Sequence, residues 1–311
     1  MLVGVCSVKG SPGVTTVALG LAVAWSPGSV LLVEADPSGG DVGLWWEIGS
    51  DPGLVSLAGA ARRGRPGDVD VLEHAYEADP GLWVVPGPAG AEQARAALHV
   101  LVDRAGLLPT LTGPAHGPDD GRRFDAVIVD LGRLDPASPA RGLVGVLDVL
   151  LVVGRDSTAD LTHLAAAAPD LTDGTARATT GVVLTQGCRY RTREVEEAIG
   201  GPVVAVLPPD PVTAAALAGT RTGAGGRRRR GQAASPLLTT LGELVPRLSP
   251  RANPALDPDR PPAPVERLQT ARALRAAPRT AQEAGWTRPA SARLSVTAEA
   301  TDPTVADRRS S

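Results

Sequence analysis

The chain has 311 residues, 43% of them hydrophobic, so it is long enough for one large α/β domain. Its formal net charge of −3 gives no global electrostatic field that favours binding to nucleic acid or membrane. The longest apolar run, residues 144–153, contains Asp148 and is too short to span a bilayer, and no basic and apolar leader precedes the first apolar segment. The two cysteines, Cys6 and Cys188, have no spacing typical of disulfides or metal sites, so we expect a soluble cytoplasmic protein.

The first apolar segment leads into a loop rich in glycine, serine and proline, and residues 3–16 read V-G-V-C-S-V-K-G-S-P-G-V-T-T. A helix is predicted over residues 17–24. A strand, a glycine-containing loop and a helix start form a layout that binds phosphate, because the first NH groups of a helix lack intrahelical partners and carry partial positive charge.

The spacing G-x-x-x-x-G-K-[ST] of the common P-loop is only partly present in this segment. Aligned on Gly13 and Thr15, the first glycine is replaced by Val8 and the usual lysine by Val14.

Lys9 is the only lysine in the chain, since every other basic residue that is not histidine is arginine. If lysine placement were neutral, this one would fall inside the loop with a chance of roughly 1 in 40, so we interpret it as functional. A compact ammonium on a flexible stem suits a narrow phosphate site better than a planar guanidinium does.

Acidic residues follow two further predicted strands. Residues 29–33 are apolar and are followed by E-A-D-P-S-G-G-D at 34–41, and the predicted strand 124–131 contains Asp130 after four hydrophobic residues, as in a Walker B motif. Carboxylates at the carboxyl ends of parallel strands point into the crevice where open α/β sheets bind ligands. Asp41 is a turn residue on this reading, with a site role as the alternative.

The remaining strands are apolar throughout rather than alternating, which favours a parallel sheet covered on both faces. We therefore predict a three-layer α/β fold, with a mostly parallel twisted sheet and helices on both faces, over residues 1–248. The further predicted strands are 82–85, 147–153, 181–184 and 203–207, and the further predicted helices are 92–108, 159–171, 193–199, 212–218 and 236–248, with a surface loop at 110–123.

Residues 249–311 alternate proline, arginine, alanine and acidic residues without bulky apolar periodicity. Such a composition buries too little surface to offset the entropy of ordering, so we predict a disordered tail. A short helix over residues 265–276 is the one element expected there.

Taken in order, these motifs resemble the MinD/ParA family of deviant P-loop ATPases. The segment K-G-S-P-G-V-T-T at 9–16 is similar to the family loop with its early signature lysine, and E-A-D-P-S-G at 34–39 to its second motif. Asp130 matches its Walker B acid, and L-P-P-D-P at 207–211 looks like its late loop near the adenine.

The resemblance implies ATP and Mg²⁺ as cofactors and a homodimer that encloses the nucleotides. Lys9 would then reach phosphate oxygens on the partner subunit, and Asp36 would position the attacking water. Mg²⁺ would be held by Thr15, Asp36 and Asp130. The nucleotide would be bound by Lys9, Gly10, Ser11, Gly13, Val14, Thr15, Thr16, Pro208 and Asp210.

Three departures from the family pattern are Val14 for the second lysine, Glu34 for the first acid of the second motif, and Thr185 for an adenine-reading asparagine. Val14 removes a charge-assisted contact worth about 1.5 to 3 kcal/mol, so weak or no hydrolysis is expected. With G-G-D-V-G at 39–43, the pattern looks most like the CpaE/TadZ branch of pilus-assembly proteins, although no receiver-like domain precedes the first strand.

Three functions remain open on this basis. The first is a nucleotide-dependent dimerising switch that positions or assembles a cellular machine. The second is an active ParA-type ATPase that partitions DNA, with Arg227, Arg228, Arg229 and Arg230 as the DNA contact. The third is a pseudo-ATPase scaffold.

Other features favour structural interpretations. Trp45 and Trp46 fit core packing better than a partner surface, and the 265–276 segment has too few bulky apolar residues for stable membrane binding. The four histidines, His74, His99, His116 and His163, are scattered and suggest no metal site.

Overall fold

A computed structural model describes residues 1–10, 12–25, 28–113, 123–173, 178–185, 189–219 and 235–248. Several sequence predictions lie outside these residues, namely those for Ser11, His116, Cys188, the arginines 227–230 and the tail 249–311 with its helix 265–276.

The described residues form a sheet of eight strands in the order β3-β4-β2-β5-β1-β6-β7-β8. Every neighbouring pair is parallel except β3 and β4, which are antiparallel. This confirms the predicted mostly parallel sheet. The strands are β1 (Leu2–Ser7), β2 (Val30–Glu34), β3 (Tyr76–Asp79), β4 (Leu82–Val85), β5 (Ala126–Arg133), β6 (Val149–Arg155), β7 (Thr179–Thr185) and β8 (Val203–Leu207).

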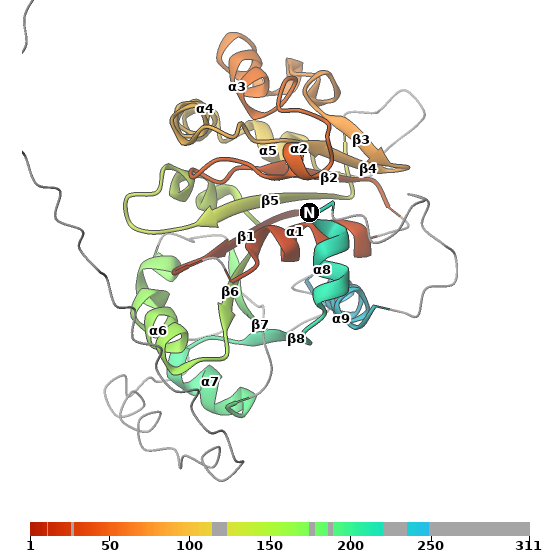
Figure 1. The fold of residues 1–311 in the computed structure, drawn as a ribbon. Coiled ribbons are helices and arrows are strands. Elements are labelled where there is room, and N and C mark those ends of the chain that lie inside the picture. Colours follow the sequence, from red (N-terminus) through yellow and green to blue (C-terminus); the bar gives the residue numbers. More distant parts are fainter. Residues whose placement is uncertain are drawn as a thin grey trace, which may run out of the picture. The chain divides into compact units, whose positions relative to one another are not determined.

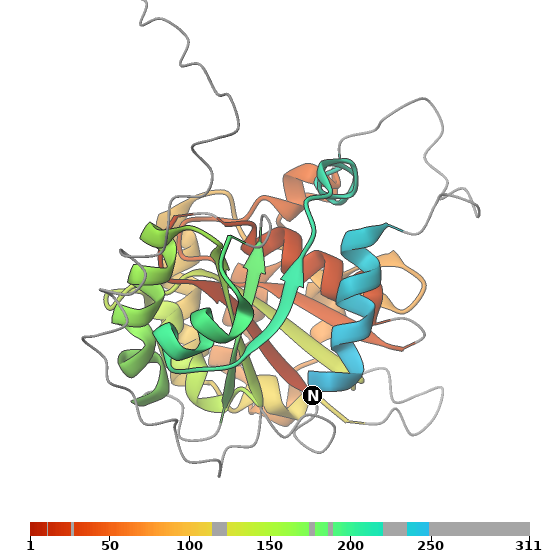
Figure 2. The same cartoon turned by 90° about the horizontal axis from the view of Figure 1, so that it is seen from below.

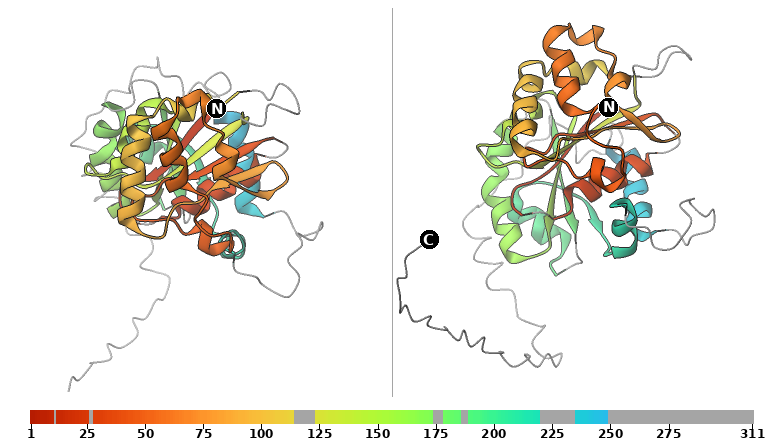
Figure 3. Two further views of the ribbon diagram at one scale, coloured as in Figure 1. Left: turned by 90° about the horizontal axis from the view of Figure 1, so that it is seen from above. Right: turned by 45° about the horizontal axis from the view of Figure 1, so that its top comes forward.

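Helices cover both faces of this sheet, as predicted, and Figure 1 shows the layers. In Figure 2, α9 (blue) lies beside α1 (red), and Figure 3 shows α3 next to α4. The helices are α1 (Val14–Ala24), α2 (Val42–Trp45), α3 (Leu54–Arg63), α4 (Ala91–Asp103), α5 (Leu107–Thr110), α6 (Thr158–Asp173), α7 (Thr192–Ile199), α8 (Pro211–Leu217) and α9 (Pro236–Leu244), with short 3-10 turns η1 (Pro66–Asp68), η2 (Val71–His74), η3 (Pro139–Val146) and η4 (Val245–Leu248).

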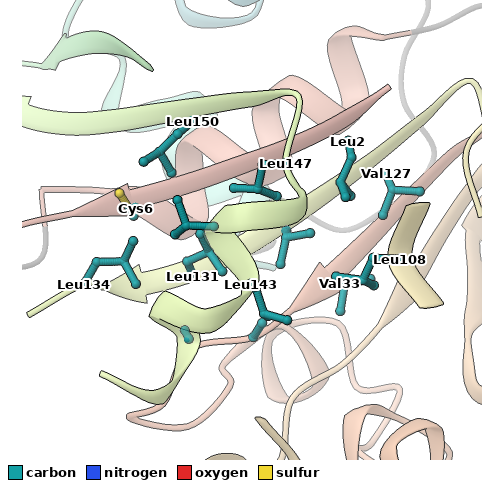
Figure 4. Close-up of a cluster of buried hydrophobic side chains, with 14 of the residues drawn as sticks. Leu2, Cys6, Val33, Leu108, Val127, Leu131, Leu134, Leu143, Leu147 and Leu150 are labelled. Carbon is teal, nitrogen blue, oxygen red and sulfur yellow. The ribbon is translucent and has the colours of Figure 1, made fainter. Parts of the chain in front are cut away.

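The core has two halves because successive side chains of a strand point to opposite faces. In β1, Leu2 and Cys6 pack under α3 to α7, in the half shown in Figure 4, whereas Val3 and Val5 pack under α1 and α9. Cys6 is a free, buried thiol whose pKa is raised by burial, so it is an ordinary core residue in this structure.

Some predicted boundaries are wrong. The helix predicted at 92–108 ends at Asp103, and α5 begins at Leu107 after Gly106, a residue about 1 kcal/mol less favourable than alanine inside a helix. The helix predicted at 236–248 ends at Leu244 and continues as a 3-10 turn that contains Pro246, which has no NH to donate.

The sequence reading also omitted α2, α3 and β3. The apolar residues of α3 recur at helical spacing, and Leu54, Leu57, Ala58 and Ala61 are all buried. Within the part of the chain that the structure describes, no helix has both the length and the apolar character needed to cross a bilayer.

Candidate functional site

The strand order of the sheet changes direction at β1, beside the carboxyl ends of β5 and β2. β5 lies between β1 and β2, and β6 lies on the other side of β1. The chain therefore builds β2 to β5 on one side of β1 and then crosses over to build β6 to β8 on the other side. Open α/β sheets bind ligands at such a switch point. The loop after β1 therefore lies beside the ends of the strands that contain Asp130 and Glu34.

The loop after β1 ends in an open helix start. The helix α1 begins at Val14, three residues earlier than the sequence predicted, and its N-cap Gly13 has a φ of 98°, in the left-handed region that favours glycine. The N-cap residue, as a glycine, has no side chain to cap the helix. Its first NH groups can therefore bind an anion, as the sequence predicts for Val14, Thr15 and Thr16.

Two hydroxyl side chains, one from β1 and one from β7, contact this loop. The Ser7 hydroxyl donates to the carbonyl of Gly10 at 3.3 Å, and the Thr185 hydroxyl lies 3.4 Å from the carbonyl of Pro12. Gly10 has a φ of 67°, and a Cβ placed on it would meet no atom within 4 Å. The loop backbone thus leaves open space at Gly10, where a ligand can approach closely.

Val14, the residue in place of the usual P-loop lysine, points into the core. Its side chain is only 6% exposed and packs in the half of the core under α1 and α9. This position therefore contributes packing to the fold and a backbone NH to the loop, and no charge.

Asp130 is buried in β5 and has an unsatisfied oxygen. Its Oδ1 accepts the NH of Gly132 at 3.0 Å, whereas its buried Oδ2 has no hydrogen-bond partner among the residues that the structure describes. Burial raises the pKa of Asp130 to about 7, and the nearby Glu34 and Asp36 carboxylates act in the same direction. The Thr15 side chain lies within hydrogen-bonding reach of the Asp130 carboxylate and lowers this pKa.

Asp36 lies beside Asp130 because Gly132 leaves room for it. Its Oδ1 accepts the NH of Ser38 at 2.7 Å. A Cβ added to Gly132 would lie 2.1 Å from the Asp36 Cγ, and Gly132 has a φ of 56°. The sequence analysis missed Gly132, although its position two residues after the Walker B acid could have indicated it.

The three predicted Mg²⁺ ligands are thus brought together. Thr15 comes from α1, Asp36 from the loop after β2 and Asp130 from β5. Among the described residues, no group of three or more His, Cys, Asp and Glu side chains could hold a metal ion alone. One hydroxyl, one or two carboxylates and ligand phosphates are a donor set suited to Mg²⁺, and the unpartnered Asp130 Oδ2 fits it.

Glu34, the departure from the second motif, has a positioning role. Its Oε1 accepts the NH groups of Asp41 and Val42 at 2.7 and 3.0 Å, and its Oε2 accepts the NH of Gly87 at 2.8 Å. Burial raises the pKa of Glu34, and these three donors oppose that rise. Glu34 therefore joins the loop that contains Asp36 to the loop after β4.

Lys9 contacts a residue that the sequence analysis set aside. Its Nζ lies 2.6 Å from Nε2 of His163 in α6, and both side chains are exposed. The separation of 154 positions leaves no local sequence signal for this contact.

The two other predicted nucleotide ligands lie after β8. Pro208 is half-buried. Asp210 caps α8 by accepting the NH of Thr213 at 3.0 Å and also accepts the hydroxyl of Ser235 at 2.7 Å. The Thr213 NH, followed by the Ser235 hydroxyl, lowers the pKa of Asp210. The Asp210 carboxylate thus joins α8 to α9 in this structure.

Trp46 connects the region after Asp36 to α8. Its indole Nε1 donates to the carbonyl of Leu217 at 2.8 Å, and both Trp45 and Trp46 are partly buried against the core under α1. A Cβ on Gly219 would lie 1.9 Å from the Trp45 carbonyl oxygen, so the two segments are in close contact.

A scan against protein-family models finds no match, and a search of curated proteins finds no relative. Solved structures do match. A ParA family ATPase from Chlorobium tepidum aligns with a TM-score of 0.59 at 19% identity, over 80% of this chain and 98% of that one.

Two further matches are MinD proteins. The cell division ATPase MinD of Pyrococcus furiosus has a TM-score of 0.58 at 22% identity, over 80% of this chain and 99% of its own. MinD of Pyrococcus horikoshii, solved with Mg-ADP, has a TM-score of 0.56 at 18% identity, over 82% and 98%. At these identities the similarity establishes the fold.

Proposed function

We propose that this chain, which has the fold of the MinD and ParA ATPases, is a cytoplasmic ATP-binding switch that uses Mg²⁺ and dimerises around its nucleotides. The observation that supports this proposal most directly is the buried Oδ2 of Asp130, which has no hydrogen-bond partner among the described residues. The Asp130 carboxylate lies close to the Thr15 side chain, and Thr15 is in the first turn of α1, whose N-cap is a glycine. A cation would bind the Asp130 oxygen, and a phosphate would accept hydrogen bonds from the NH groups at the start of α1.

In this proposal the loop backbone holds the phosphates. The donors are the NH groups of Gly10, Ser11, Gly13, Val14, Thr15 and Thr16. Thr15, Asp36 and Asp130 hold Mg²⁺, which neutralises phosphate charge when bound. Asp36 orients the attacking water, and Lys9 reaches the nucleotide of the partner subunit. Pro208 and Asp210 border the base, with Asp210 keeping its contacts to α8 and α9.

We further propose that hydrolysis is weak or absent and that the chain belongs to a CpaE-like branch. The burial of Val14 supports weak hydrolysis, because this position supplies no cation to the β and γ phosphates. The missing contact corresponds to about a ten- to hundredfold loss in affinity or rate. The motif pattern at 34–43 supports the branch.

Calorimetric titration with ATP and Mg²⁺ tests the nucleotide site. We expect wild type to bind, Lys9→Ala to bind about ten- to hundredfold more weakly, and Lys9→Arg to fall between the two because it keeps the charge without the compact ammonium. Thr15→Val should lose the Mg²⁺ dependence. Absence of binding by wild type would overturn the proposal and favour a scaffold that uses the fold only for protein contacts.

Sedimentation analysis with a non-hydrolysable ATP analogue tests the dimer. Wild type should shift from monomer to dimer on addition of the analogue and Mg²⁺, and Lys9→Ala should stay monomeric. A wild-type protein that binds nucleotide without any change in mass would remove dimerisation from the proposal and leave nucleotide binding standing.

The second candidate is an active ParA-type ATPase that partitions DNA, favoured by the four consecutive arginines at 227–230. It predicts DNA binding that weakens steeply with salt and phosphate release that DNA stimulates. Replacing the four arginines with glutamine should abolish both effects. A rate of phosphate release that DNA leaves unchanged would exclude this candidate.

A further inference from the structure

The contact between Lys9 and His163 joins the sole lysine of the chain to a distant helix. The Lys9 Nζ and the His163 Nε2 are 2.6 Å apart. An ammonium has no lone pair, so Lys9 donates and Nε2 accepts, which places the imidazole hydrogen on Nδ1.

From charge alone, the Lys9 ammonium would be expected to contact a carboxylate rather than an imidazole. The carboxylates of Asp36 and Asp130 lie on the β5 and β2 side of β1, whereas His163 belongs to α6, which follows β6 on the other side. No ion pair between Lys9 and an acid is found in the described part of the chain. The Lys9 ammonium is thus held by a neutral acceptor on the opposite side of its loop from these two acids.

We propose that His163 is a positioning residue that holds Lys9 in a resting position on its own subunit and thereby limits nucleotide-dependent self-association. This inference rests on the proposed function, in which Lys9 has to reach the nucleotide of the partner subunit. Lys9 must leave His163 to do so, because a docked ammonium is fixed against α6 of its own chain. The apparent affinity of self-association is the intrinsic affinity multiplied by the undocked fraction of Lys9 in each of the two subunits.

The expected effect is modest because both side chains are exposed. A single solvent-exposed hydrogen bond shifts such an equilibrium by about two- to tenfold. His163→Ala removes the acceptor, whereas His163→Gln retains an acceptor oxygen on a side chain that also reaches outward. An exposed position on a helix tolerates both changes, and thermal unfolding should show both variants to be folded.

Amine acylation measures the docking directly, because Lys9 is the only lysine and the Met1 amine is the one other reactive amine of the polypeptide. The protein is treated with a limiting amount of an amine-reactive ester without nucleotide, and peptide masses give the extent at each amine. We expect His163→Ala to raise labelling of Lys9 about two- to tenfold over wild type, with His163→Gln near wild type and Met1 unchanged. Equal Lys9 labelling in wild type and His163→Ala would overturn the docking.

Sedimentation with the ATP analogue and Mg²⁺ then tests the regulatory part. Because both subunits must release Lys9, His163→Ala should dimerise about four- to hundredfold more tightly than wild type, His163→Gln should resemble wild type, and adding His163→Ala to Lys9→Ala should have no effect. Unchanged dimerisation of His163→Ala, with raised labelling, would overturn the regulation. The acylation result needs no nucleotide, so it separates failure of the docking from failure of the proposed function.

Discussion

At the scale of single residues, Gly132 determines where Asp36 can lie. In Gly132→Ala the new Cβ would meet the Asp36 carboxylate at about 2.1 Å, and alanine at a φ of 56° costs about 1 to 2 kcal/mol. We expect a lower free energy of unfolding by at least this amount and weaker binding of nucleotide with Mg²⁺. Chemical denaturation and calorimetry measure the two effects.

Gly145→Ala is the matched control for Gly132→Ala. Gly145 lies in η3, has no positive φ, and a Cβ placed on it would meet no atom within 4 Å. It should unfold and bind as wild type does. If Gly132→Ala also matches wild type, the site does not need this close packing.

Val14 allows a second test, of whether its position belongs to the core or to the phosphate site. Val14→Lys places an ammonium where a side chain is 6% exposed, so we expect the unfolding free energy without nucleotide to fall by about 2 to 4 kcal/mol. Val14→Met, which has about the length of lysine but no charge, should lose less stability than Val14→Lys. Equal stabilities of the two variants in denaturant would show that position 14 is open to solvent.

The buried Asp130 makes a prediction about pH. Its pKa is about 7 in the folded protein and near 3.9 in an unfolded chain, so its contribution to stability is fully present below about pH 4 and is lost as the pH rises through 7. The loss is on the order of 2 to 4 kcal/mol.

Asp130→Asn removes this titration and provides the comparison. The unfolding free energy of wild type minus that of Asp130→Asn, both without nucleotide, should decrease between pH 5 and pH 8. Denaturation curves at each pH measure this difference. A difference that is constant or increases with pH would mean that burial does not dominate the ionisation of Asp130.

At the scale of elements, Glu34 joins two loops that are distant in sequence. Glu34→Gln keeps the shape but replaces one acceptor oxygen by an NH₂ group, so at least one of the NH groups of Asp41, Val42 and Gly87 loses its partner. We expect a loss of about 1 to 3 kcal/mol and faster amide exchange in the loops at 35–42 and 86–90.

Hydrogen exchange followed by mass spectrometry measures this effect, with α7 and β8 as internal references far from Glu34 in the sheet order. Glu34→Asp is a useful companion, since it restores the usual family acid but shortens the side chain. If Glu34→Gln exchanges as wild type does in both loops, Glu34 does not hold them together.

At the scale of the whole described fold, Trp46 links the segment after β2 to Leu217 of α8, which lies 171 residues later in the sequence. Trp46→Phe removes the NH donated to Leu217 but keeps an aromatic ring, so we expect a loss of about 1 kcal/mol and faster amide exchange in both α2 and α8. Val212→Ala, on the exposed part of α8, should change the stability by less than about 0.5 kcal/mol. Faster exchange in α2 alone would mean that the two helices move independently.

Much of this fold could be predicted from local patterns. The apolar segments that became β1, β2, β4, β5, β6, β7 and β8 were recognised because a strand covered on both faces must be apolar along its length. The short helix α2 and the edge strand β3 were not, since α2 has only four residues and β3 is largely exposed. The start of α1 was placed too late, because Val14 and two threonines are weak helix formers.

The sequence by itself determined most of the strands and of the longer helices, the strand-loop-helix layout with its single lysine, and the two acids expected beside it, because each depends on neighbours a few residues away. Only the tertiary structure decided which way Val14 points, that Gly132 makes room for Asp36, that Glu34 joins two loops, and that Lys9 contacts His163. Each of these depends on atoms brought together from separate elements, and the packing of the sheet and its helices sets those distances.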